Sequence, residues 1–126
     1  MEIAETNYVT VWIEDGILFC SYKEQITIDL DTAKKIVKDR IEFTKGVSYP
    51  ILIDFTNLKS VTKDARDFMN EPTGGLSGLV KGAFLSNSVV TTVFINLYLK
   101  INKPTIPTRF FTNKQEALNW LKNGSN

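Results

Sequence analysis

The stretch Pro50-Ile51-Leu52-Ile53-Asp54-Phe55 is a nearly continuous apolar run with one acid near its end. Such a run is typical of a strand buried on both faces of a parallel sheet. The preceding segment, residues 31–44, repeats apolar residues at spacings of three and four, as the buried face of a helix does. Asp29 and Asp31 are candidate N-caps for this helix, and Gly46 is placed to end it. Its predicted buried face consists of Ala33, Ile36, Val37 and Ile41.

Further strands and helices flank this helix–strand pair. Residues 8–13 and 17–22 alternate around Asp15-Gly16, a pair that tolerates the positive φ of a tight turn, and predict an antiparallel hairpin. Residues 26–28 extend its second strand or follow it after a bulge. The remaining predicted elements are a helix over 63–70, a strand over 82–85, a helix over 89–101, a strand over 108–111, and a last helix that begins after Asn113.

The order of these elements predicts the fold class. We expect one α/β domain over residues 1–126, with a mixed five-stranded sheet and about four helices, mainly on one face. The N-terminal hairpin supplies the antiparallel part of the sheet, and the crossovers between parallel strands are right-handed.

Composition excludes several function classes. The chain has 15 basic and 14 acidic residues, a formal charge of +1 and no histidine, so neither a nucleic-acid partner nor histidine-dependent catalysis is indicated. Its one cysteine, Cys20, excludes an internal disulfide and a paired-cysteine metal site. We expect a cytoplasmic protein with no metal, no cofactor, no secretory signal and no membrane span.

Polar residues follow the predicted parallel strands at the edge where open α/β sheets place their ligands. Asp54 ends its strand, and we predict a small-ligand rim around it. The alternative is that these side chains only cap helices and close turns. The candidate ligand-binding residues are Asp54, Thr56, Asn57, Ser86, Asn87 and Ser88, with Thr112 and Asn113 directly after the last strand.

The predicted helix over 89–101 is apolar around most of its girth. We expect its core face to consist of Val90, Val93, Phe94, Leu97 and Ile101. Ile95, Tyr98 and Leu99 then continue the apolar surface and need a second cover. That cover is a loop such as residues 76–80, a second subunit across a two-fold interface, or an apolar ligand. We predict a homodimer with Ile95, Tyr98 and Leu99 at the interface.

Two other segments have simple structural interpretations. The glycine-rich stretch over residues 74–78 lacks the lysine and hydroxyl residue of a phosphate-binding loop, and we interpret it as a flexible loop. Cys20 lies in an alternating apolar segment, and we expect it to be a small buried hydrophobe rather than a nucleophile.

Three stretches give the chain a family resemblance: residues 50–61, Ala83-Phe84-Leu85, and the closing segment from Phe110 to Leu121. On these residues the chain resembles the STAS-like domains of anti-anti-sigma factors, and more closely the bacterial branch described as STAS/Sec14-like. The resemblance covers nearly the whole chain. It implies a STAS-like fold, and the Sec14-like name implies apolar ligands, although a shared shape does not establish a function.

In STAS domains that act as phosphorylation switches, the resemblance implies a serine or threonine in an Asp-Ser-Ser-Gly-like turn. This sequence departs from that motif, since the equivalent region reads Ser60-Val61-Thr62-Lys63-Asp64-Ala65. Thr62 and Ser60 are the possible phosphoacceptors there. The alternative is that Thr62 only caps the following helix.

The sequence favours a non-enzymatic regulatory or protein-interaction domain, with a homodimer or another protein as partner. The first alternative is a carrier of a small apolar ligand or lipid. The weakest alternative is an enzyme that uses Asp54.

Overall fold

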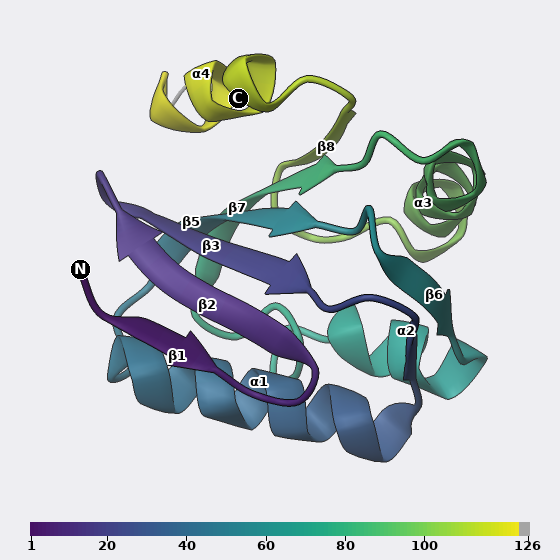
Figure 1. Cartoon of the computed structure of the whole chain (residues 1–126), viewed down its shortest axis with the longest axis horizontal. Helices are drawn as coiled ribbons and strands as arrows, with labels where there is room; N and C mark the ends of the chain where they lie inside the picture. The colour runs from purple at the N-terminus through teal and green to yellow at the C-terminus, as the bar shows by residue number, and fades with distance from the viewer. Residues whose placement is uncertain (124–126) are drawn as a thin grey trace.

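The computed structural model describes residues 1–123, apart from the side chains of Val90 and Phe94. Within these residues, six strands form the main sheet in the order β1-β2-β3-β5-β7-β8 (Figure 1). The pairings among β1, β2 and β3 are antiparallel, and those from β3 through β8 are parallel. The strands are β1 (Ile3–Glu5), β2 (Val9–Glu14), β3 (Ile17–Tyr22), β5 (Tyr49–Asp54), β7 (Leu79–Leu85) and β8 (Thr108–Phe111).

The helices are α1 (Leu30–Thr44), α2 (Lys63–Met69), α3 (Val89–Asn102) and α4 (Lys114–Lys122). Each begins after a residue whose side-chain oxygen accepts a backbone N–H in the first turn, which satisfies a donor that the helix leaves free. These caps are Asp29, Thr62, Ser88 and Asn113. No helix among residues 1–123 has the length and apolar character needed to cross a membrane.

Figure 1 shows α1 and α4 on opposite faces of the sheet, with α3 at the edge toward which β3, β5 and β7 run. Neighbouring residues of a strand point to opposite faces of the sheet, so the strands contribute side chains to two hydrophobic cores. On β3, for example, Leu18 and Cys20 join one core and Phe19 joins the other. Helices α1, α2 and α3 cover the first core, and α4 covers the second.

The predicted mixed sheet with an N-terminal hairpin and about four helices is confirmed. Three short strands differ from the prediction. The short β1 adds a sixth strand to the main sheet. Residues 26–28 do not extend the hairpin, because β4 (Ile26–Ile28) pairs in parallel with β6 (Leu58–Val61) in a separate two-stranded sheet. Gln25, at a φ of 59°, turns the chain there, and its N–H donates to the carbonyl oxygen of Asn57 at 3.1 Å.

The glycine-rich segment packs closely against the end of α2. A Cβ on Gly75 would lie 2.1 Å from the carbonyl oxygen of Met69, far inside contact distance. A Cβ on Gly74 would lie 2.6 Å from the carbonyl oxygen of Phe68. The glycines therefore allow a close backbone approach between this segment and the end of α2.

Candidate functional site

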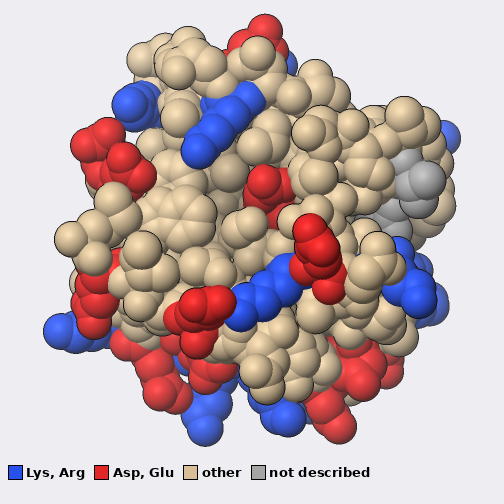
Figure 2. Space-filling view, in the orientation of Figure 1, with Lys and Arg blue, Asp and Glu red and all other residues tan. Residues whose placement is uncertain are grey.

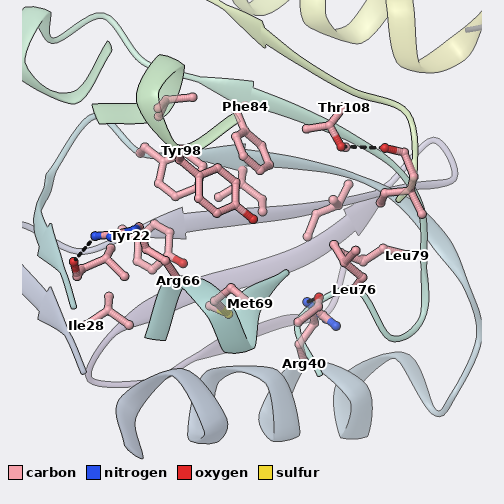
Figure 3. A pocket seen from close by; sticks show the side chains of 18 residues that line it. Tyr22, Ile28, Arg40, Arg66, Met69, Leu76, Leu79, Phe84, Tyr98 and Thr108 are labelled. Atoms are coloured by element: carbon pink, nitrogen blue, oxygen red, sulfur yellow. Dashed lines mark hydrogen bonds between the residues drawn. The ribbon is translucent and has the colours of Figure 1, made fainter. Parts of the chain in front are cut away.

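A cavity of about 70 Å³ lies between one face of the sheet and the helices α1, α2 and α3 (Figure 3). The strands β5 and β7 form its floor, and Met69, Ile95 and Tyr98 line it from the helices. Most of the side chains around it are apolar, as in small-molecule sites that use a few polar groups for orientation. The strands line it with Ile51, Ile53, Gly82 and Phe84, among others.

Arg40 is the most unusual residue at this cavity. Its side chain rises from α1 beneath Leu76 and Leu79 (Figure 3), and only 6% of Arg40 is exposed. Nη1 donates to the carbonyl oxygen of Gly75 at 3.0 Å, and Nη2 donates to that of Ser77. Arg40 therefore ties α1 to the glycine-rich segment.

The charge of Arg40 has no acidic partner in the described structure. Burial lowers the pKa of its guanidinium, but arginine stays protonated at any physiological pH. Within residues 1–123, ion pairs join Lys23 to Glu5 and Lys63 to Asp67, and none joins Arg40 to a carboxylate. A buried cation is normally paired with an acidic group. Here the carbonyl oxygens of Gly75 and Ser77 stabilise the Arg40 charge instead.

Gly82 leaves space open on the cavity floor. It lies within β7, opposite Ile51 of β5 and Thr108 of β8. A Cβ there would find Phe84 at 3.7 Å and Thr108 at 3.8 Å, both ordinary contact distances. No steric conflict requires glycine at this position, and glycine inside a strand often marks a close approach by a ligand or another backbone.

Two tyrosines offer neutral hydroxyl groups at the cavity. Burial raises the pKa of Tyr22, and it raises that of Tyr98 to about 12. Both side chains therefore remain protonated at neutral pH. The Tyr98 hydroxyl lies 3.4 Å from Oδ1 of Asn70 on the neighbouring α2 end.

The predicted rim around Asp54 is assembled, and the bonds of its side chains go to backbone N–H groups of the same turns or of the facing loop. Asp54 Oδ1 accepts from the Thr56 N–H at 2.9 Å, and Thr56 Oγ1 accepts from the Asn87 N–H at 3.4 Å. Ser88 caps α3, and its own N–H donates to Oγ of the buried Ser86 at 3.0 Å. The bonds of Asp54, Ser86 and Ser88 close turns and start a helix, as the simpler interpretation expects, whereas the Thr56–Asn87 bond joins two loops.

The rim and the cavity are separate places in the fold. None of the six rim candidates Asp54, Thr56, Asn57, Ser86, Asn87 and Ser88 lines the cavity. Asn57 uses its carbonyl oxygen to hold Gln25, and Asn113 caps α4 through the Glu116 N–H. Ligand binding at the rim stays a prediction.

Helix α3 presents the opposite face to the core from the one expected. Ile95 and Tyr98, predicted at an interface, are 1% and 8% exposed and belong to the chain's own core. Leu99 is half-buried. Val93, Leu97 and Ile101, predicted in the core, are exposed, while Val90 and Phe94 lie outside the described side chains. The prediction of Ile95 and Tyr98 as interface residues is therefore wrong.

The reversal leaves a continuous apolar stripe on the surface of α3. We call it the exposed ridge, and it consists of Val89, Val93, Leu97 and Ile101, which are 80%, 64%, 55% and 65% exposed. Figure 2 shows mostly uncharged atoms over α3 on the visible face, whereas charged atoms crowd the lower margin, near α1. Within the described residues, the protein thus leaves this row of large apolar side chains in contact with solvent.

Both possible phosphoacceptors use their hydroxyl groups in hydrogen bonds within the chain. Thr62 Oγ1 caps α2 by accepting from the Ala65 N–H at 3.3 Å, and it also donates to Asp64. Ser60 lies on the exposed side of β6 and donates to Oγ1 of Thr27 at 3.1 Å. Capping by Thr62 is confirmed, and its phosphorylation stays a prediction.

Cys20 is confirmed as a small buried hydrophobe. It is 5% exposed, and burial raises the pKa of its thiol to about 12. A thiol nucleophile requires the opposite conditions, namely access and a lowered pKa.

Comparison with known proteins supplies a family and a fold. A family model described as "Domain of unknown function (DUF7793)" matches residues 11–125. The chain is similar to an uncharacterised protein of the DUF3478 family with a SpoIIAA-like fold from Shewanella loihica PV-4. The TM-score is 0.61 with 14% identity, over 95% of this chain and 99% of that chain. This likeness confirms the predicted STAS-like fold.

A second solved structure, of a protein with unknown function from Arthrobacter sp. FB24, is 25% identical with a TM-score of 0.34, over 89% of this chain and 97% of that chain. No curated protein matches the chain.

Proposed function

The chain belongs to the DUF7793 family of domains of unknown function, and for this member we propose a non-enzymatic regulatory role through pairing of two copies along α3. The observation that carries the proposal is the exposed ridge. Large apolar side chains that stay in water in a row are typical of an interaction surface. A SpoIIAA-like fold is compatible with such a role.

The spacing of the ridge suits a helix–helix contact. Its four residues follow one another at intervals of four, so they form one of the rows that pack into the grooves of a facing helix. When two such rows interdigitate, the helices cross at about −50°. A two-fold axis brings identical surfaces together, so one ridge is sufficient to form both halves of the contact.

The charges on α3 also permit self-pairing. Lys100 is the only charged residue between Val89 and Asn102. In an antiparallel pair the two Lys100 side chains would lie at opposite ends, about 13 Å apart along the axis. That separation exceeds the Debye length of about 8 Å at physiological ionic strength, so their repulsion is small.

The size of the contact predicts a weak dimer. A helix of 14 residues is about 21 Å long, and a contact confined to one helix per partner falls at the low end of interface areas. We therefore expect a reversible dimer that dissociates on dilution.

The non-enzymatic part of the proposal is supported by the chemistry of the candidate groups. The sequence has no histidine, and the one thiol is buried with a raised pKa. Asp54 uses its carboxylate to hold the Thr56 N–H.

Sedimentation equilibrium over a dilution series tests the pairing. We expect a mass near twice 14.3 kDa at high concentration that falls toward the monomer on dilution. A monomer at every concentration would contradict the proposal.

A second candidate function is that of a carrier or sensor of a small apolar ligand. The observation that favours it is the apolar cavity between the sheet and helices α1 to α3.

A further inference from the structure

The cavity combines an apolar lining with one buried cation. Arg40 carries the only formal charge that is both within the cavity lining and buried, among the side chains the structure describes. Arg66 also lines the cavity, is half-buried, and donates to the carbonyl oxygen of Val61 at 3.3 Å. The site therefore offers positive charge and no carboxylate, so it favours an anionic group and repels a cationic one.

Arg40 has donors to spare for such a group. A guanidinium carries five N–H donors in a planar fork, and the two bonds to Gly75 and Ser77 use two of them. The remaining donors suit an acceptor with two oxygens, because arginine and carboxylate match in geometry. An anion bound there would also supply the partner that a buried charge otherwise lacks.

Gly82 provides the second, independent observation. Central strands favour β-branched residues, and glycine weakens a strand interior. Because a Cβ on Gly82 would meet only ordinary contacts, a larger side chain is compatible with the backbone, and it would occupy the cavity. Packing alone would favour a larger side chain at position 82, yet the chain has glycine there and leaves the cavity open.

We propose that the cavity binds a small carboxylic acid with a short apolar body, with the body against Ile51, Gly82 and Phe84 and the carboxylate toward Arg40. This inference deepens the second candidate function and rests on it, but it does not depend on pairing through α3. The volume of about 70 Å³ is roughly half that of an engineered cavity of about 150 Å³ that takes up benzene. The buried body is therefore a few carbon atoms long.

The test is a titration of the full chain, labelled with ¹⁵N, with three probes of matched length: pentanoate, pentan-1-ol and pentan-1-amine. Amide shifts of the cavity lining report binding. We expect saturable shifts with pentanoate at least about tenfold tighter than with pentan-1-ol, and weakest with the amine. Equal affinity for acid and alcohol, or no saturable shift with pentanoate, would overturn the proposal.

Two variants connect the result to the named residues. Gly82→Val should retain the fold and lose saturable binding of both the acid and the alcohol, because its methyl groups fill the cavity. Arg40→Met should bind the alcohol as before and lose the preference for the acid to about twofold or less. If Gly82→Val, folded by its amide spectrum, binds pentanoate as tightly as the unaltered chain, the acid sits elsewhere and the proposal is wrong.

Each outcome can be separated from the pairing through α3. The titration reads cavity amides, whereas pairing is read from the mass of the particle. Failure of the pentanoate series leaves the dimer unaffected, and a monomeric protein with a saturable acid site leaves this inference standing.

Discussion

Arg40 on α1 donates from Nη1 to the carbonyl oxygen of Gly75, 35 residues further along the chain, at 3.0 Å. This bond and its neighbour to Ser77 attach the first helix to the segment that leads into β7. The same side chain lines the cavity, so one residue connects the packing of α1 with the proposed ligand site.

Replacing Arg40 should destabilise the fold measurably. Arg40→Met leaves the carbonyl groups of Gly75 and Ser77 without their donor, and we expect a loss of about 1–3 kcal/mol in the free energy of unfolding. Urea denaturation followed by circular dichroism measures it. Lys38→Met, an exposed position on the same helix, is the control and should change stability by less than about 0.5 kcal/mol. Equal effects of the two substitutions would show that the Arg40 bonds contribute little.

Two glycine substitutions should act in opposite directions. Gly82→Ala places its Cβ at ordinary contact distance and removes backbone freedom from the unfolded chain, so stability should rise by about 0.4–1 kcal/mol. Gly75→Ala places its Cβ 2.1 Å from the Met69 carbonyl oxygen, so the chain must shift and stability should fall by well over 1 kcal/mol. Thermal unfolding of the pair measures both changes. A loss of stability in Gly82→Ala would mean that the floor of the cavity has no free space.

If Thr62 caps α2, stability should depend on whether the residue at position 62 can accept a hydrogen bond. Thr62→Ala removes the capping hydroxyl, leaves the Ala65 N–H with Asp64 Oδ1 at 2.9 Å as its acceptor, and should cost about 0.5–2 kcal/mol. Thr62→Asn keeps a capping oxygen and should stay close to the unaltered chain. Denaturant unfolding of the two variants checks the order, which would be reversed or absent if the hydroxyl had no capping role.

Cys20 should react slowly in the folded protein. With a pKa of about 12, only about one thiol in 10⁴ is ionised near pH 8, and the side chain is also buried. A chromogenic disulfide reagent should therefore label the folded chain far more slowly than the urea-unfolded chain. Equal labelling rates would show that Cys20 is accessible.

The raised pKa of Cys20 also has a consequence at alkaline pH. Above about pH 9 the unfolded chain loses the thiol proton while the folded chain keeps it, so stability falls as pH rises toward the folded pKa of about 12. The stability of Cys20→Ala should fall less over the same range.

Local signals in the sequence predicted most of the fold. The hairpin turn at Asp15-Gly16 has both residues at positive φ, and the caps Asp29, Thr62, Ser88 and Asn113 begin the four helices. These features depend on nearest neighbours, and so they can be recognised without the tertiary structure. The strands β1, β4 and β6 are each only three or four residues long and depend on distant partners, which is why they were missed or misplaced.

The orientation of α3 could not be obtained from its pattern. Because the helix is apolar around most of its girth, no single face stands out as the core face. The chain buries the side with Thr91, Ile95 and Tyr98, where the ring of Tyr98 lies 5.8 Å from that of Phe84. The need for a second contact surface was predicted, but its residues were assigned to the wrong side.

The cavity was not predicted, because Arg40 was not recognised as a buried residue of α1. A signal existed, since Arg40 falls three residues after Val37 and four after Ile36, on the face of α1 that was predicted to be buried. Ile41, chosen in its place, is only half-buried. Placing an arginine in the core requires carbonyl partners, and these come from residues more than 30 positions away, beyond the reach of a helical pattern.

Leu97→Glu, compared with Val47→Glu, tests whether two copies pair through the exposed ridge of α3. The two residues are 55% and 53% exposed, so both substitutions should leave the fold intact, but only Leu97 lies on the ridge. In sedimentation equilibrium at a concentration where the unaltered chain is dimeric, we predict a monomer for Leu97→Glu and a dimer for Val47→Glu. A dimer for Leu97→Glu as stable as that of the unaltered chain would contradict pairing through the ridge.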